Sequence, residues 1–306
     1  NEWYESLQSL DHGMLNEKLE ARLMTRVKAN SENEPATSSK KGKTHLLNNF
    51  DKDLLRLFNE VRFWGKFDGI NIPYVAHDIA GQQKERLRVM RAGVSFVVRQ
   101  YNEIIDALTE RERRLFSDHI KKLDRRLAPG IFKLHWTSKN VKEWFIPNWI
   151  EACNDTMKVV KSYKEGMREI DVQCRLIAKT QLILIEKNVI YDDGDFEAKQ
   201  KMHRETIKDL LKKSHSIIDA TMKKLYTHFE GQPNEVQSEW RHMKFVVDER
   251  VEKALRETAK RSLLELSRAI NGDSRTEPQP IFSVHVVLEN SQKIEFSPSI
   301  ISLTEM

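Results

Sequence analysis

Apolar residues in this chain recur at alternating steps of three and four, and this periodicity constrains the fold more than any other feature. The spacing places apolar side chains along one face of an α-helix. A first regular stretch holds Leu47, Phe50, Leu54, Leu57, Val61 and Trp64. A second holds Leu87, Met90, Val94, Val97, Tyr101, Ile104 and Leu108. Because both are seven-residue repeats, neighbouring helices should pack at shallow angles, as in bundles and coiled coils.

Longer helices are predicted in the second half of the chain. A stripe from Ile150 to Leu184 predicts a helix over about 138–187, roughly 75 Å long at ~1.5 Å per residue, with Pro147 and Gly166 as possible interruptions. Two more helices follow, and Asn271-Gly272 closes the last of them.

Two sequence features predict departures from helix. Pro129-Gly130 is expected to break a helix and open a loop. After Pro280 the apolar period changes from helical spacing to two, over 282–288 and again over 293–296. This alternation predicts one β-hairpin.

The predicted fold class is all-α, with successive elongated bundles of long antiparallel helices and one small C-terminal β-hairpin. The expected divisions are an N-terminal helix over 1–28, a flexible loop over 29–45, a helical bundle over 46–130, a long-helix bundle over 131–275, and the hairpin with the start of a next segment over 276–306.

Composition narrows the function classes. Charged residues make up 32% of the chain, yet 51 basic and 46 acidic side chains leave a net charge of only +5, which is a weak excess for a dedicated nucleic-acid binder. No apolar run approaches the roughly 20 residues that cross a bilayer. Cys153 and Cys174 are too far apart on one helix to bond, which favours a reducing compartment and buried, reduced thiols.

No motif predicts catalysis, a cofactor or a metal site. Gly42-Lys43-Thr44 resembles the end of a phosphate loop, but Thr37 occupies the position of the required first glycine. The acidic residues from Asp192 to Glu197 lack the spacing of a calcium loop, so helix capping is the simpler interpretation. The histidines form no set with zinc-ligand spacing.

The candidates for partner contact are clusters of basic residues and tryptophans that lie outside the apolar stripes. Basic side chains at helix positions outside the apolar stripe usually form a solvated face. The next alternative is a patch that binds another protein. Tryptophan is frequent among residues that anchor interfaces. The candidate contact residues are Lys121, Lys122, Arg125, Arg126, Trp136 and Trp144.

Several motifs in one order carry a resemblance to a known family. The stretch from Leu54 to Leu108 contains LRLFNEVRFWGKF, then IPYV, then RLRVMRAGVSFVVRQYNEIIDAL. ERRLFSDHIKKLDRRLAPGIFKLHW and SLLELSRAINGDSRTEPQPIFSVHVVLE follow. From about Leu47 to Met306 the sequence resembles the tail of axonemal dynein heavy chains, with an outer-arm chain favoured; the first forty-odd residues carry no match.

The resemblance implies a non-enzymatic tail segment whose ATPase ring lies outside this chain. It also implies WD-repeat intermediate chains, light chains, other heavy chains and docking proteins as partners, in the cytoskeleton of a ciliary axoneme, with no membrane. The alternative function is a helical nucleic-acid-binding array that uses the basic faces. A third hypothesis, an enzyme with an unrecognised site, is disfavoured because no convergent set of titratable residues is visible.

Overall fold

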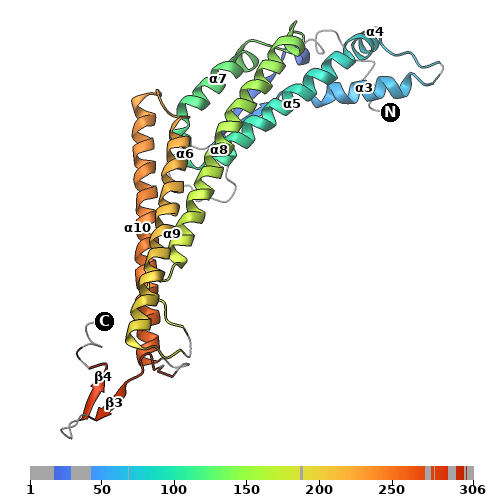
Figure 1. The fold of residues 1–306 in the computed structure, drawn as a ribbon. Coiled ribbons are helices and arrows are strands. Elements are labelled where there is room, and N and C mark those ends of the chain that lie inside the picture. Colours follow the sequence, from blue (N-terminus) through green and yellow to red (C-terminus); the bar gives the residue numbers. More distant parts are fainter. Residues whose placement is uncertain are drawn as a thin grey trace, which may run out of the picture. The chain divides into compact units, whose positions relative to one another are not determined.

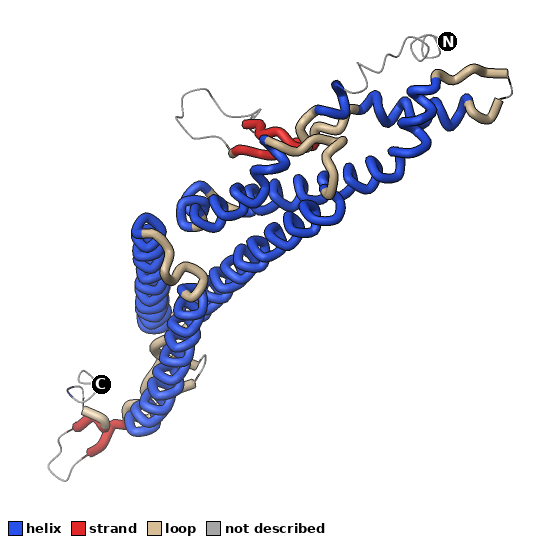
Figure 2. Tube along the Cα trace, turned by 90° about the horizontal axis from the view of Figure 1, so that it is seen from above, coloured by secondary structure: helices blue, strands red, loops and turns tan. Residues whose placement is uncertain are grey.

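The computed structural model describes residues 17–28, 43–67, 69–186, 189–272, 277–278, 280–288, 294–299 and 301. Helices dominate this part of the chain (Figures 1 and 2). The chain divides into two compact units, residues 1–162 with 231–237 and residues 163–230 with 238–306. The mostly helical fold class predicted from the sequence is confirmed. No helix among the described residues is long and apolar enough to span a membrane.

The first unit begins with a strand pair that the sequence did not predict. Strands β1 (Met24–Lys28) and β2 (Thr44–Asn48) pair antiparallel, with Met24 opposite Asn48. The prediction of a helix over 1–28 is therefore wrong at its C-terminal end, although 17–20 are helical and 1–16 lie outside the described residues. The helical spacing there rests on few apolar residues, and pairing with β2 overrides it. Most of the predicted 29–45 loop also lies outside the described residues.

Short and long helices follow in the first unit. They are α3 (Lys52–Trp64), α4 (Tyr74–Asp78), the π-helix η1 (Ile79–Gln83), α5 (Lys84–Ala107), α6 (Glu110–Leu115) and α7 (Ser117–Phe132). Asp51 caps α3 by accepting a hydrogen bond from the Asp53 backbone N–H, which explains why the helix starts after β2. Leu47, expected on the helical stripe, belongs to β2 and is exposed.

The stripe from Leu87 to Leu108 is confirmed as a core seam. All seven of its predicted residues are buried, and Met90, Val94 and Ile104 are fully inaccessible. Helix α5 therefore presents one continuous apolar face to the first unit, as its heptad spacing predicts.

Pro129 and Gly130 do not break the helix as the sequence predicted. Both lie inside α7, which ends at Phe132. Pro129 has no N–H to donate to the carbonyl four residues earlier, so α7 loses one helical hydrogen bond there, and the Pro129 carbonyl accepts from Leu134. Gly130 is needed for packing, because a Cβ there would meet Met24 and come within 2.7 Å of Trp149.

Three long helices contribute to the second unit. After the π-helix η2 (Val141–Phe145), α8 (Ile146–Lys179) runs from the first unit into the second. It is followed by α9 (Asp193–Tyr226) and α10 (Asn234–Asn271). Neither suggested interruption ends α8: Pro147 lies in its first turn, where proline is tolerated. Gly166 gives Leu225 room, since a Cβ there would lie 2.9 Å from that side chain.

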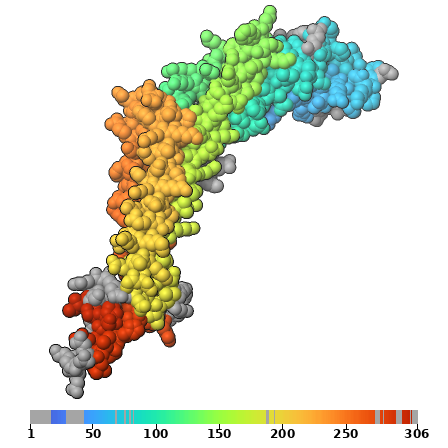
Figure 3. Space-filling view, in the orientation of Figure 1, coloured from blue at the N-terminus to red at the C-terminus, as the bar shows by residue number. Residues whose placement is uncertain are grey.

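The predicted C-terminal hairpin is confirmed. Strands β3 (His285–Leu288) and β4 (Ile294–Ser297) pair antiparallel, and every residue in them is exposed. In the space-filling view they belong to the red region at the C-terminal end of the colour scale (Figure 3). Gly272, with a φ of 70°, follows α10 in the left-handed conformation that the Asn271-Gly272 pair predicted.

Candidate partner-binding surface

The basic face that the sequence singled out lies on α7. Thr109 and Glu112 form a reciprocal capping box that starts α6, and the chain turns at Phe116 before α7 begins. Phe116, Leu123 and Leu127 are buried, so one side of α7 is fixed against the core. The helical period then places Lys121, Lys122, Arg125 and Arg126 on the remaining surface, and all four are exposed.

Trp149 locks α7 against α8. Its ring is buried beside Gly130, and its Nε1–H donates a 2.9 Å hydrogen bond to the carbonyl of Arg126. Cys153, one turn further along α8, is also fully buried. The backbone of α7 is thus held rigidly while the side chains of Lys122 and Arg126 extend outward.

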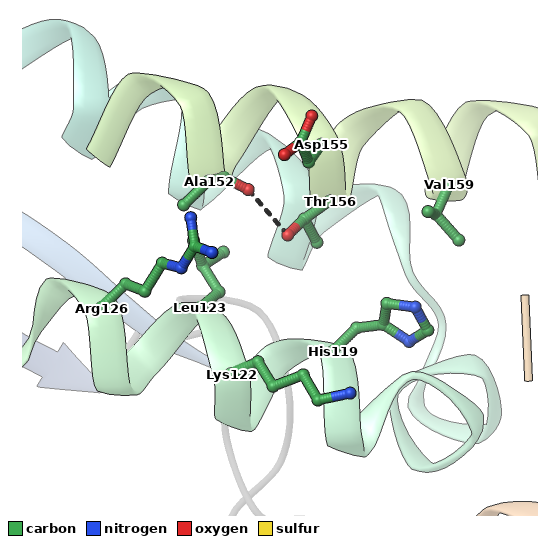
Figure 4. Close-up of a pocket in the computed structure, with 8 residues that line it drawn as sticks. All are labelled: His119, Lys122, Leu123, Arg126, Ala152, Asp155, Thr156 and Val159. Carbon is green, nitrogen blue, oxygen red and sulfur yellow. Dashed lines mark hydrogen bonds between the residues drawn. The ribbon is translucent and has the colours of Figure 1, made fainter. Parts of the chain in front are cut away.

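Lys122 and Arg126 line one side of a shallow hollow of about 170 Å³ between α7 and α8 (Figure 4). His119 and Leu123 complete the α7 side, and Ala152, Asp155, Thr156 and Val159 form the α8 side. The Thr156 hydroxyl donates to the Ala152 carbonyl at 2.9 Å, so its proton is already used. The hollow has the dimensions of a side-chain socket and not of a cofactor pocket.

The charge on this surface is positive. Lys122 pairs with Asp118 at 2.7 Å, and Asp155 is 3.5 Å from Lys158. Asp124 is turned to the other side of α7, where it pairs with Arg26 at 2.9 Å and accepts a hydrogen bond from Tyr101. Within the described part of the chain, no carboxylate pairs with Lys121, Arg125 or Arg126. We call Lys121, Lys122, Arg125 and Arg126 the basic face of α7.

The two candidate tryptophans have different environments. Trp136 is fully buried and its ring packs edge-on against Phe50, with 4.8 Å between centroids. Its proposed role in partner contact is therefore wrong, because the loop before η2 folds inward and uses the ring to fill the core. Trp144, on η2, is 68% exposed and keeps its role as a candidate contact.

Sequence reasoning missed an exposed aromatic cluster at the end of α3. The rings of Phe63, Trp64 and Phe67 lie with centroids 5.2 to 6.1 Å apart, and Phe63 and Phe67 are half exposed. The signal was present, because adjacent positions such as 63 and 64 point about 100° apart on a helix and cannot both lie on one stripe.

The two thiols are free, and burial raises both of their pKa values. For Cys153, burial raises the pKa to about 12, so the thiolate is scarce at neutral pH. The pKa of Cys174 is raised by its partial burial and by nearby Asp171. Cys153 is buried as predicted, whereas Cys174 is only half buried.

Two observations bear on ligand chemistry. Thr44 opens strand β2, whereas the Lys-Thr of a phosphate loop opens a helix whose N-terminus binds the anion. Among the residues that the structure describes, no group of three or more His, Cys, Asp or Glu side chains could hold a metal ion.

These features define a helical segment with an exposed basic face, and comparison with known proteins places it in a family. Residues 1–144 match the family model of dynein heavy chain, N-terminal region 1. The chain is 38% identical to the dynein-1-beta heavy chain of the flagellar inner arm I1 complex of Chlamydomonas reinhardtii, over 99% of this chain and 6% of that protein. It is 34% identical to human dynein axonemal heavy chain 2, over 83% of this chain and 6% of that protein.

The chain belongs to the dynein heavy-chain family, and it is a segment of the N-terminal region. It spans about 6% of the length of these relatives. The ATPase motor domains of the family lie elsewhere, so this segment is not itself catalytic.

The comparisons also sharpen two expectations. The family match covers residues 1–144, so the resemblance extends through the N-terminal stretch in which the sequence motifs showed none. A further relative, the dynein-1-alpha heavy chain of the same Chlamydomonas complex, is 29% identical over 56% of this chain. Two of these relatives are thus named for an inner arm, and none of the relatives named above supports the outer-arm subtype.

Proposed function

We propose that this segment is a structural and assembly element in the tail of an axonemal dynein heavy chain of the inner-arm I1 kind. The inner-arm subtype is supported by 38% identity to an I1 heavy chain along nearly the whole segment, and replaces the outer-arm subtype expected from motifs. In this role the segment supports microtubule-based ciliary motility without taking part in ATP hydrolysis.

The basic face of α7 is the surface we assign to partner binding in this unit. The observation that carries this assignment is that Lys121, Arg125 and Arg126 are exposed without a carboxylate partner among the described residues, on a helix whose backbone Trp149 holds fixed. A fixed positive surface attracts an acidic patch and raises the rate of association. The partners we propose are WD-repeat intermediate chains, light chains, other heavy chains and docking proteins of the ciliary axoneme.

The test is a binding titration of the 306-residue chain with a purified axonemal intermediate chain at low and high salt. Replacing Lys122→Gln and Arg126→Gln should slow association and reduce its salt dependence. The matched control replaces Lys139→Gln and Lys142→Gln, which are exposed in the same unit but lie outside α7.

Thermal melts of both double variants should match that of the unchanged chain, because exposed charges contribute little to stability. Equal association rates for the α7 variant and the control would remove the basic face from partner binding. The same titration with duplex DNA tests nucleic-acid binding, which would give a steep loss of affinity with salt if phosphates were contacted.

A further inference from the structure

The second unit contains a groove between α9 and α10, which lie side by side (Figure 1). Its volume is about 310 Å³, and its apolar lining comes from both helices: Ile218, Met222, Val247, Val251 and Leu255. Near the helix connection, Trp240 stacks on Phe229 and contacts Tyr226, which holds the two helices together. We call this feature the α9–α10 groove.

Helix α8 and the segment after it already cover part of the α9–α10 pair. There, Arg250 of α10 pairs with Asp171 of α8 at 2.9 Å, and the Thr258 hydroxyl donates to the Ile177 carbonyl. Just past α8, the backbone N–H of Leu182 donates to the Ser262 hydroxyl at 2.8 Å. Three helices packed in this way leave one long groove open, and in a four-helix bundle the fourth helix fills that groove.

An apolar stripe on α10 extends the α9–α10 groove toward the end of that helix. It steps by four, four, three and four residues through Leu255, Ala259, Leu263, Leu266 and Ile270. Leu263 is 62% exposed and Ile270 is 52% exposed. These steps keep the stripe on one face of the helix, and such an apolar stripe left in water marks a surface for another helix.

A basic row on α9 extends the same groove on its other side. His215 and Asp219 line the groove, and stepping back along this face of α9 leads to Lys212, Lys208 and Arg204, all exposed. Because α9 and α10 are antiparallel, this direction follows the α10 stripe. Lys208 pairs with Glu205 at 3.2 Å, whereas Arg204 and Lys212 have no carboxylate partner in the described part of the chain.

We propose that the α9–α10 groove binds an amphipathic α-helix of another protein, with acidic residues along one edge of its apolar stripe. The apolar residues of that helix pack on the stripe from Leu255 to Ile270, and its acidic residues face Arg204 and Lys212. From Lys244 to Ile270 the groove and the stripe that extends it together span about 39 Å at ~1.5 Å per residue, enough for roughly seven helical turns.

The positive charge of the basic row on α9 favours an acidic helix over a second copy of the chain. Two copies joined stripe to stripe in antiparallel orientation would bring their basic rows together, and like charges across an interface disfavour that complex. The groove adds a second partner surface to the proposed assembly function, and it does not use the basic face of α7.

The probe is a synthetic helical peptide with leucines at heptad spacing and glutamates along one edge, and a matched peptide carries lysines in their place. Binding of each to the 306-residue chain is measured by fluorescence anisotropy. Replacing Leu263→Gln and Ile270→Gln should weaken binding of the glutamate peptide by at least about tenfold, as loss of central apolar anchors does. Leu264→Gln is the control, because Leu264 is 49% exposed on the same helix but faces away from the stripe.

The lysine peptide should bind at least about tenfold more weakly than the glutamate peptide, and Arg204→Gln with Lys212→Gln should narrow that difference. Equal weakening by Leu264→Gln, or equal binding of both peptides, would overturn the proposal. Dimerisation of the chain in sedimentation, abolished by Leu263→Gln, would assign the groove to a second copy instead. The α7 variant should leave peptide binding unchanged, so failure here and failure of the basic face are separate results.

Discussion

The two strand pairs are alike in size and in antiparallel pairing, yet their surroundings differ completely. In β1–β2, Met24 and Leu46 are fully buried, whereas every residue of β3–β4 is exposed. An isolated two-stranded hairpin is at best marginally stable in water. What fixes a strand pair is therefore the surface on which it packs.

Helix α5 provides that surface for β2. The side-chain amide of Asn102 accepts a hydrogen bond from the Leu46 N–H at 2.9 Å and donates one to the Leu46 carbonyl at 3.0 Å. Asp106, one turn later, bonds to Lys43 at 2.9 Å and to His45 at 3.1 Å. The C-terminal pair is held by hydrogen bonds to the segment just before β3. There the Tyr191 N–H donates to the Ile281 carbonyl, and the Tyr191 carbonyl accepts from the Ser283 N–H.

The largest expected difference comes from shortening one leucine in each pair. Leu46→Ala removes a fully buried side chain and should lower the free energy of unfolding of the first unit by about 2–5 kcal/mol, through lost burial and a residual cavity. Leu288→Ala, at a residue that is 72% exposed, should change stability by less than about 0.5 kcal/mol. Urea denaturation of both variants measures this, and similar losses would contradict the contrast between the pairs.

A second variant removes the hydrogen bonds from α5 without changing a strand. Asn102→Ala leaves both backbone groups of Leu46 without their side-chain partner, and the cost should be about 1–3 kcal/mol. Gln100→Ala, two residues earlier on α5, is the control because its side chain bonds only to Glu103 in the described residues, at 3.4 Å. Hydrogen exchange at the Leu46 amide should quicken in the first variant alone; unchanged protection would show that packing, and not Asn102, fixes β2.

The stability of β1–β2 should also depend on pH, because Asp106 bonds to residues of β2 and of the segment just before it. Partial burial opposes the charged form of Asp106, but hydrogen bonds from Lys43 and His45 outweigh it and lower the pKa of Asp106 below its ordinary 3.8. The resulting stabilisation is fully present above pH 3.8 and is lost as the pH falls through the lowered folded-state pKa. The effect should be small, because Asp106 is half exposed and its ion pairs are screened.

Thermal melts between pH 5 and pH 2.5 test this expectation. Asp106→Asn should remove only the part of the acid-induced loss of stability that comes from the Asp106 contacts. An identical pH profile for Asp106→Asn and the unchanged chain would show that the Lys43 and His45 contacts carry no stability.

The smallest effect is expected on the basic face of α7. Lys121→Gln with Lys122→Gln should cost less than about 0.5 kcal/mol, because only the Lys122–Asp118 pair is lost and its lysine is exposed. This value gives the stability change expected of a surface substitution, and the changes in the two strand pairs are compared with it. A loss as large as that of Leu46→Ala in the same denaturation experiment would mean that α7 packs with a different side toward the core.

Much of the candidate surface could be predicted from residue spacing. The period of α7 places Lys121, Lys122, Arg125 and Arg126 outside the core, and the structure confirms that they are exposed. The hollow beside them could not be predicted, since its other side comes from Asp155 and Thr156 on α8, about thirty residues later. Trp136 was misassigned for the same reason: a residue in a loop gives no periodic signal of which way it points.

The sequence by itself determined the long helices, the buried seam of α5 and the presence of the C-terminal hairpin, because each is encoded by a period that neighbouring residues share. Tertiary structure decided the rest. It formed β1–β2 from segments fifteen residues apart, kept Pro129 and Gly130 in a helix where Trp149 needs the space, and turned Trp136 onto Phe50. These outcomes depend on contacts between residues distant in the chain, and such contacts override local preference when they bury more apolar surface or satisfy more backbone hydrogen bonds.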